Sequence, residues 1–263
     1  MIRGGELEEK REQKRIIANK YFIKLNKIYS MFMKQHKHRF IVYFQNKIII
    51  IQMASNNRVQ TFYNSRNNLL QILETIGYDI EQYAGFSVNE IDERMKTMQL
   101  DMELRKPTGE KIYVKYLCGN KTPTKMLNAK TLEQIIEDLF INSETLEKRD
   151  TLIIVIDGEP NDSMLDRFKY LYDHDGYFIV CHNIARLQFN ILEHEKVPKS
   201  EVATDTEITE VMRKFNITTR KQFPEIGRFD PVSLALCLRP DQICKIHRPT
   251  PTAGTSMFYR VCV

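Results

Sequence analysis

The sequence predicts an α/β domain followed by a small α+β domain, and three observations support this division. An unbroken apolar run over residues 152–156 lies between two segments with helical hydrophobic spacing, which is typical of a strand buried on both faces. Helical and strand patterns alternate over residues 61–192, whereas the remainder opens with a helix and closes with two strands. A polar stretch with Pro198 separates the two patterns, so we predict domains at residues 53–192 and 193–263.

The α/β region opens with two helices and a hairpin. Apolar residues recur at helical spacing from Thr61 to Ile76, and Gly77 stands where a C-terminal cap belongs. Ser87 and Glu90 have capping-box spacing, which predicts a second helix to about residue 98. Alternation over 100–104 and 112–116, with turn residues between, predicts a β-hairpin.

The rest of this region alternates helices with strands. Helical spacing over 132–140 and 164–172 predicts two helices, which flank the buried strand at 152–156. Further strands are predicted at 177–181 and through the alternating Leu187, Phe189 and Ile191. A hairpin joined to strands that follow helices indicates a mixed sheet.

The C-terminal region has its own start signals. Thr204 and Glu207 have capping-box spacing and predict a helix whose apolar face is Ile208, Val211, Met212 and Phe215. Asp230 followed by Pro231 predicts the N-cap and first turn of a short helix. Strands are predicted at 242–247 and 257–262, and the loop between them contains Pro249, Pro251 and Gly254.

The net charge of +5 is concentrated at the N-terminus. Residues 1–52 carry +8 and residues 53–263 carry −3, so the folded body lacks the positive field that sustains independent binding to duplex DNA. Six residue types with AT-rich codons fill 23 of the 32 positions from 21 to 52. We expect residues 1–52 to be upstream sequence, with Met53 as the start. The alternative is a basic arm for DNA or an anionic surface.

The cysteines and the apolar segments exclude several classes of protein. Five widely spaced cysteines without a CxxC pair indicate reduced thiols rather than a disulfide framework or a zinc site. The apolar stretch over 40–51 is short and is interrupted by Gln45, Asn46 and Lys47, so we expect no membrane span and no cleavable signal peptide.

Short motifs in the C-terminal region carry a family resemblance. His194, Glu195, Val197 and Pro198 open the series; Phe223, Pro224 and Ile226 follow, and then Asp230, Pro231 and Val232; Leu238, Lys245, Ile246, Arg248 and Pro249 come next; Ala253, Gly254, Tyr259, Arg260 and Val261 close it. In this order and spacing they resemble the fifth subunit shared by the eukaryotic nuclear RNA polymerases and the archaeal polymerase subunit that corresponds to its last third. More weakly, residues 63–78 resemble the opening helix of the family's N-terminal jaw domain.

The resemblance implies a non-catalytic polymerase subunit without cofactors. Its jaw domain, residues 53–192, would have a restriction-endonuclease-like fold and lie near downstream DNA, with Pro160, Asn161 and Ser163 in a DNA-proximal loop. Capping of the next helix by Asn161 or Asp162 is the alternative for that loop. The C-terminal domain would bind the largest subunit, and residues 190–263 should suffice for this. The implied partner-binding residues are His194, Pro198, Pro224, Arg228, Asp230, Pro231, Arg239, Lys245, Arg248, Gly254, Tyr259 and Arg260.

Two departures from the family pattern concern turns. The family usually has Gly where this chain has Cys237, and it often has Gly where this chain has Pro240 and Asp241. The alternative function is a free-standing transcription cofactor that uses the same assembly module. Location in the nucleus is expected for a cellular protein, and location in a cytoplasmic viral factory or a virion for the product of a large DNA virus.

The residue patterns do not support an enzymatic function. Nuclease chemistry on this fold needs E-x-K beside a second carboxylate, and only Glu8 with Lys10 and Glu12 with Lys14 have that spacing, in the charged N-terminal run. Neighbouring Cys181 and His182 on a strand point to opposite faces, which predicts a core thiol and a surface imidazole rather than a nucleophile with its base. There is no glycine-rich phosphate loop.

Overall fold

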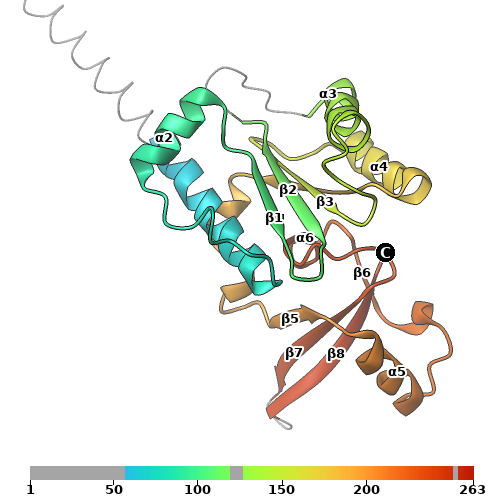
Figure 1. Ribbon diagram of the computed structural model, residues 1–263. Helices are drawn as coiled ribbons and strands as arrows, with labels where there is room; N and C mark the ends of the chain where they lie inside the picture. Colours follow the sequence, from blue (N-terminus) through green and yellow to red (C-terminus); the bar gives the residue numbers. More distant parts are fainter. Residues whose placement is uncertain (1–56, 119–126, 251–253) are drawn as a thin grey trace, which may run out of the picture. The chain divides into compact units, whose positions relative to one another are not determined.

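The N-terminal region contains a four-stranded mixed sheet. The computed structural model describes residues 57–118, 127–250 and 254–263, and residues 58–263 form one compact unit. The strands β1 (Met102–Arg105), β2 (Lys111–Tyr116), β3 (Thr151–Ile156) and β4 (Phe178–Asn183) lie side by side in that order (Figure 1). The β1–β2 hairpin is antiparallel, and the other two pairs are parallel. The predicted mixed sheet and hairpin are confirmed; residues 1–52 lie outside the described residues.

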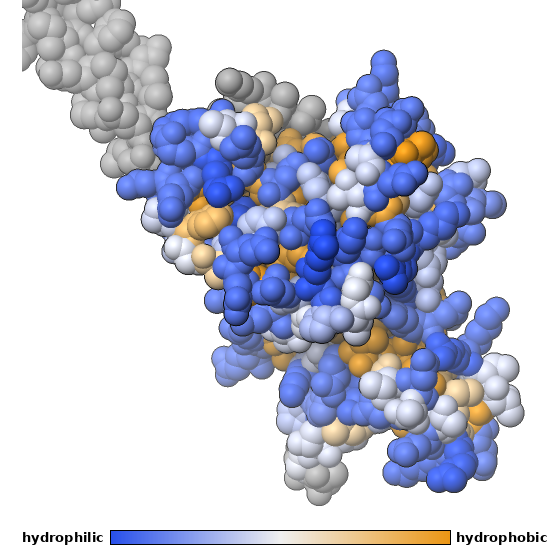
Figure 2. Space-filling model, viewed as in Figure 1, coloured by the Kyte–Doolittle hydropathy of each residue, from blue (hydrophilic) through white to orange (hydrophobic). Residues whose placement is uncertain are grey.

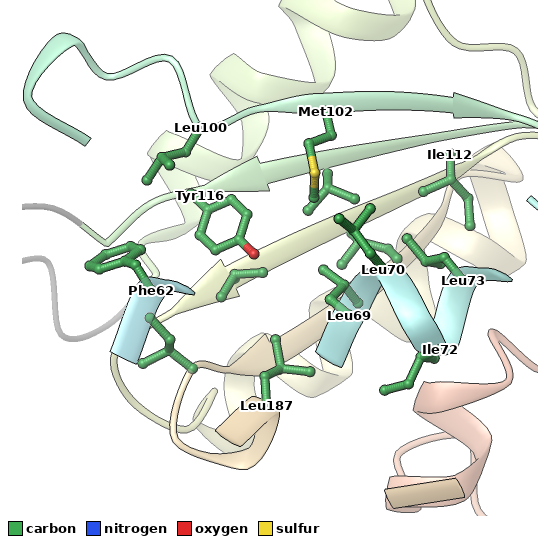
Figure 3. Packing of buried hydrophobic residues seen from close by; sticks show 14 of the residues in the cluster. Phe62, Leu69, Leu70, Ile72, Leu73, Leu100, Met102, Ile112, Tyr116 and Leu187 are labelled. Atoms are coloured by element: carbon green, nitrogen blue, oxygen red, sulfur yellow. The ribbon is translucent and has the colours of Figure 1, made fainter. Parts of the chain in front are cut away.

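Helices cover both faces of this sheet. The segment that is helical over residues 57–75 packs with α2 (Val88–Thr97) against one face, and Figure 3 shows its leucines pointing toward the strands. The other face is covered by α3 (Ala129–Ile136) and α4 (Asp162–Tyr170), which continue as π-helical turns over Glu137–Asn142 and Leu171–Asp175. Every residue of β3 is buried, so the strand is covered on both faces as predicted.

The predicted start and stop signals form the expected hydrogen bonds. Ser87 and Glu90 make a reciprocal capping box at α2, and Thr204 and Glu207 make another at α5 (Asp205–Lys214). Gly77 follows the first helix with φ +92°, a left-handed conformation that glycine adopts without strain. These elements could therefore be predicted from single residues at fixed spacing.

The strand predicted through Leu187, Phe189 and Ile191 is wrong. The structure has two 3₁₀ turns there, Arg186–Gln188 and Ile191–Glu193. Side chains take over the local hydrogen bonding: the Asn183 Oδ1 accepts from the amide of Ala185, and the Gln188 Nε2 donates to the carbonyls of Ile184 and Thr61. Such bonds compete with a strand ladder, so the alternating pattern was misleading.

The C-terminal region forms a second four-stranded sheet. Its order is β5 (Lys199–Val202), β7 (Ile243–Thr250), β8 (Gly254–Cys262) and β6 (Glu225–Ile226). With α5 and α6 (Pro231–Ala235) this is the predicted α+β arrangement. The short edge strands β5 and β6 were not predicted, because four and two residues are too few to show a periodicity.

One predicted core position in this region is wrong. Ile208 is buried, and Val211 and Met212 pack beside it, but Phe215 is 60% exposed. Phe215 is the C-cap of α5, where the backbone leaves helical geometry and turns the side chain away from the apolar face.

The short helix α6 connects the two sheets. Asp230 caps it with a 2.9 Å hydrogen bond from the Val232 amide to the carboxylate Oδ1, and Pro231 occupies its first turn as predicted. Ala235 belongs to the core beneath the first sheet, whereas Leu236 belongs to the core of the second. Figure 1 shows α6 between the two sheets.

Candidate partner-binding surface

The second sheet has one covered face and one that is partly open. Alternation along β7 places Ile243, Lys245 and His247 on one face and Cys244, Ile246 and Arg248 on the other. α5 packs against the first face, over a small core that includes Ile243. On the view in Figure 2, hydrophobic side chains interrupt the hydrophilic surface near β8 and α5.

The partly open face carries a groove of about 430 Å³. Four predicted partner-binding residues line it: Pro198, Asp230, Arg248 and Arg260. Between them lie Ile246 and Phe258, which are paired across β7 and β8. We call these six residues the assembly groove.

Charge and apolar area alternate within the assembly groove. Phe258 is 42% exposed, and the Arg248 guanidinium lies 5.5 Å from its ring centroid. Arg260 donates to the carbonyl of Glu225 at 3.2 Å but remains exposed. Two available guanidinium groups beside an exposed ring are the features that are enriched at protein interfaces.

Two of the predicted residues face the interior instead. The Lys245 Nζ lies 2.7 Å from a Glu207 carboxylate oxygen and 3.2 Å from one of Glu201, and its side chain is only 16% exposed. Tyr259 is half-buried, and its ring stands 6.5 Å from that of Phe223. Both side chains are committed to the packing of α5 on the sheet.

Two predicted arginines join the C-terminal region to segments that flank the first sheet. Arg239 donates to the carbonyls of Arg149 and Asp150, the latter at 3.0 Å, and its guanidinium lies 4.9 Å from the ring centroid of Phe178. Arg228 lies 3.7 Å from a carboxylate oxygen of Asp173. Both side chains therefore make contacts within the chain, between its C-terminal and N-terminal regions.

The other four predicted residues lie at turns and chain bends. The His194 Nδ1 accepts from the amide of Lys196 at 3.2 Å, and the carbonyl of Pro224 accepts from the amide of Val261 at 2.9 Å. Pro231 begins α6, and Gly254 opens β8 with φ +69°. They shape the backbone around the groove rather than line it.

The predicted DNA-proximal loop uses its polar groups internally. The Asn161 Oδ1 accepts from the amide of Met164 at 2.9 Å, so the helix-capping alternative describes this residue. Glu159 is ion-paired with Arg186 at 2.8 Å. Pro160 and Ser163 lie on either side of the cap, and Ser163 is exposed.

The predicted surface imidazole is wrong, because Cys181 and His182 are both buried. They do face opposite sides of β4, since Cys181 packs in the core under α3 and α4 while His182 lines a separate pocket. Burial raises the pKa of the Cys181 thiol to about 12 and lowers that of His182 to about 4. The thiol therefore stays protonated, and the imidazole on the opposite face of the strand cannot take its proton.

Metal and membrane chemistry have no support in the part of the chain that the structure describes. No group of three or more His, Cys, Asp or Glu side chains could hold a metal ion there. The five cysteines are free. Within the same residues, no helix combines the length and apolar character needed to cross a bilayer. The two E-x-K sequences lie outside the described residues.

Ile246 and Phe258 are groove residues that the family motifs did not single out as partner-binding. A signal existed for Phe258, since Met257 and Phe258 are adjacent apolar residues on a strand, and one of two such neighbours must face away from the core. Both are exposed, at 47% and 42%.

Comparison with known proteins identifies the family. The family model for the C-terminal domain of RNA polymerase Rpb5 matches residues 189–262. Over 80 residues the chain is 44% identical to DNA-directed RNA polymerase subunit Rpo5 of Staphylothermus marinus, covering 30% of this chain and 87% of that one. It is 37% identical over 79 residues to subunit Rpo5 of Thermococcus onnurineus, covering 30% of this chain and 95% of the relative. Subunit RPABC1 of RNA polymerases I, II and III from Caenorhabditis briggsae is 40% identical over 95 residues, 36% of this chain and 41% of the relative. The chain therefore belongs to the Rpb5 family of non-catalytic RNA polymerase subunits.

Proposed function

We propose that the C-terminal region anchors this subunit to the largest subunit of a DNA-directed RNA polymerase through the assembly groove. The observation that carries the proposal is the convergence of Pro198, Asp230, Arg248 and Arg260 around the exposed ring of Phe258. Aromatic and arginine side chains are enriched among the residues that carry most of the binding energy of an interface, because a ring buries a large apolar area and a guanidinium makes several directed hydrogen bonds.

The groove is suited to a partner segment with an apolar side chain and carboxylate or carbonyl oxygens. Arg248 and Arg260 supply donors, and Phe258 with Ile246 supplies an apolar floor. Asp230 lines the same groove, and its Oδ1 accepts from the amide of Val232 at 2.9 Å.

Co-purification with the largest subunit tests the anchor. We expect Phe258→Asp together with Arg260→Glu in the full chain to weaken assembly by about tenfold or more. Arg213→Glu, on an exposed turn of α5, is the matched control and should assemble normally. Retention of the groove variant at full stoichiometry through high salt would refute the assignment. Substoichiometric, salt-labile association of the unaltered chain would favour a free-standing cofactor.

For the N-terminal region we propose a non-catalytic jaw with a restriction-endonuclease-like fold that guides downstream DNA in the assembled enzyme. Residues 53–192 carry sixteen Lys and Arg against twenty-one Asp and Glu, so contacts to phosphate would be few and local. The loop with Pro160, Asn161 and Ser163 stays the first candidate, through main-chain amides at the start of α4.

A DNA titration tests this second part. A chain that starts at Met53, and so lacks the basic segment, should bind duplex no more tightly than the roughly 10⁻⁴ to 10⁻⁶ M of non-specific contacts at physiological salt. Sequence-selective binding in the nanomolar range would contradict it. A cellular version would work in the nucleus, and a viral one in a cytoplasmic factory or virion.

A further inference from the structure

A second pocket lies at the carboxyl end of β4, apart from the assembly groove. Its volume is about 430 Å³. Ile72 of the first helix, Leu234 of α6 and Leu187 of the following turn form its apolar walls. Phe189 stands at the mouth with 49% of its surface exposed, so the apolar surface continues outward from the pocket.

One polar side chain in the lining of this pocket is buried. His182 is only 7% exposed and lines the pocket, and no hydrogen bond within the described residues uses its imidazole. Its ring nitrogens are not among the fully buried atoms of the described residues that lack a partner, so they retain accessible surface at the pocket. Because burial lowers its pKa to about 4, the ring is neutral at physiological pH and offers one donor and one acceptor nitrogen.

The charges at the rim cancel one another. The Glu159 Oε1 accepts from the Arg186 Nε at 2.8 Å and from the Asn183 Nδ2 at 2.9 Å. Among the described residues, the one cation and the one carboxylate that line the pocket are therefore paired with each other, and no unpaired cation is left to attract phosphate. A neutral occupant with an apolar body fits this charge distribution.

We propose that the His182 pocket binds a tyrosine side chain presented by a peptide segment of another polypeptide. A phenol hydroxyl can donate to one ring nitrogen of His182 or accept from the other, while its ring contacts the partly buried Leu234 and the exposed Phe189. Tyrosine is enriched at interfaces because it combines an apolar body with one polar end.

The first test uses the side-chain analogues p-cresol and toluene on the isolated full chain, followed by NMR of the His182 imidazole. p-Cresol should shift the ring resonances and bind about three- to tenfold more tightly than toluene, the effect of one neutral hydrogen bond. In His182→Phe, which keeps a ring of similar shape, that preference should vanish while toluene still binds. Equal affinity of the two analogues for the unaltered chain, or no binding of either, would overturn the proposal.

The second test identifies the peptide and rests on the proposed assembly into polymerase. Photoreactive p-benzoylphenylalanine in place of Phe189 should crosslink, in purified enzyme, to one tyrosine-containing segment. The same group in place of Tyr170, which is 50% exposed on α4, is the control. No crosslink above that control in an assembled enzyme would reject a peptide occupant. Failure to assemble would instead count against the proposed function, and the analogue test stands without assembly.

Discussion

Replacing Cys237 should separate backbone strain from side-chain packing. Cys237 has φ +49°, in the left-handed region, at the position where the family usually has glycine. A side chain in that conformation costs roughly 1–2 kcal/mol because Cβ approaches the following carbonyl oxygen. Glycine at this position would be free of that cost.

The magnitude follows from comparing two variants. Cys237→Ala keeps Cβ, and so the strain, but loses a half-buried sulfur that packs against the core of the first sheet, at a cost of about 0.5–1 kcal/mol. Cys237→Gly loses the same contact and relieves the strain. We therefore expect the glycine variant to be about 1 kcal/mol more stable than the alanine variant.

Denaturant unfolding followed by far-UV circular dichroism measures the difference, with equal slopes required for the comparison. The melting temperature of the glycine variant should be about 2–4 °C above that of the alanine variant. Ala235→Gly, in helical geometry two residues earlier, is the control and should destabilise the protein. A glycine variant at position 237 that is no more stable than the alanine variant would refute the strain argument.

Three further predictions concern polar side chains that are buried or partly buried. Arg239→Ala should lower the unfolding free energy, measured by denaturant unfolding, by about 2–3 kcal/mol. Arg239→Lys should not restore that free energy, because an ammonium cannot reproduce the forked contacts with the carbonyls of residues 149 and 150. The pKa of His182 is about 4 in the folded protein against an ordinary 6.5, so the unfolded chain binds the proton first as the pH falls. The free energy of unfolding should therefore drop by roughly 3 kcal/mol between pH 6.5 and pH 4. His182→Phe should remove this loss in unfolding curves recorded across that range. Arg66 is 1% exposed, and two of its nitrogens have no partner in the described residues. The unfolding free energy of Arg66→Met should therefore stay within about 1 kcal/mol of the parent value, whereas Arg66→Ala should lose about 3 kcal/mol or more. Equal losses in the two variants would contradict this reasoning.

Helices and strands could be predicted from the sequence where a few neighbouring residues determine the local geometry. The two predicted α-helical capping boxes, the Asp230–Pro231 helix start and the buried β3 depend on contacts within a few residues or on uniform burial. The segment from Leu187 to Ile191 could not be predicted this way, because its turns depend on a hydrogen bond from Gln188 to a helix 127 residues earlier.

The candidate site was predictable only in part for the same reason. The family motifs named residues of one region without their orientation, so a groove residue such as Arg248 could not be told from an inward-facing residue such as Lys245 on the same strand. Strand register decides between those roles, and register depends on pairing across the sheet. The positions where this chain lacks the family's glycines could, by contrast, be interpreted from the local sequence. Cys237 and Asp241 both have the positive φ that glycine would favour.

The placement of Ala235 and Leu236 in different cores has a mechanical consequence. Successive residues of a helical turn point about 100° apart, so one rigid turn is held on two sides at once. Tilting one sheet against the other would pull one of these side chains out of its core. The turn at residues 235 and 236 therefore resists bending and does not act as a hinge. A displacement applied to the second sheet is thus carried into the first, and an anchored C-terminal region would steer the N-terminal region as a lever.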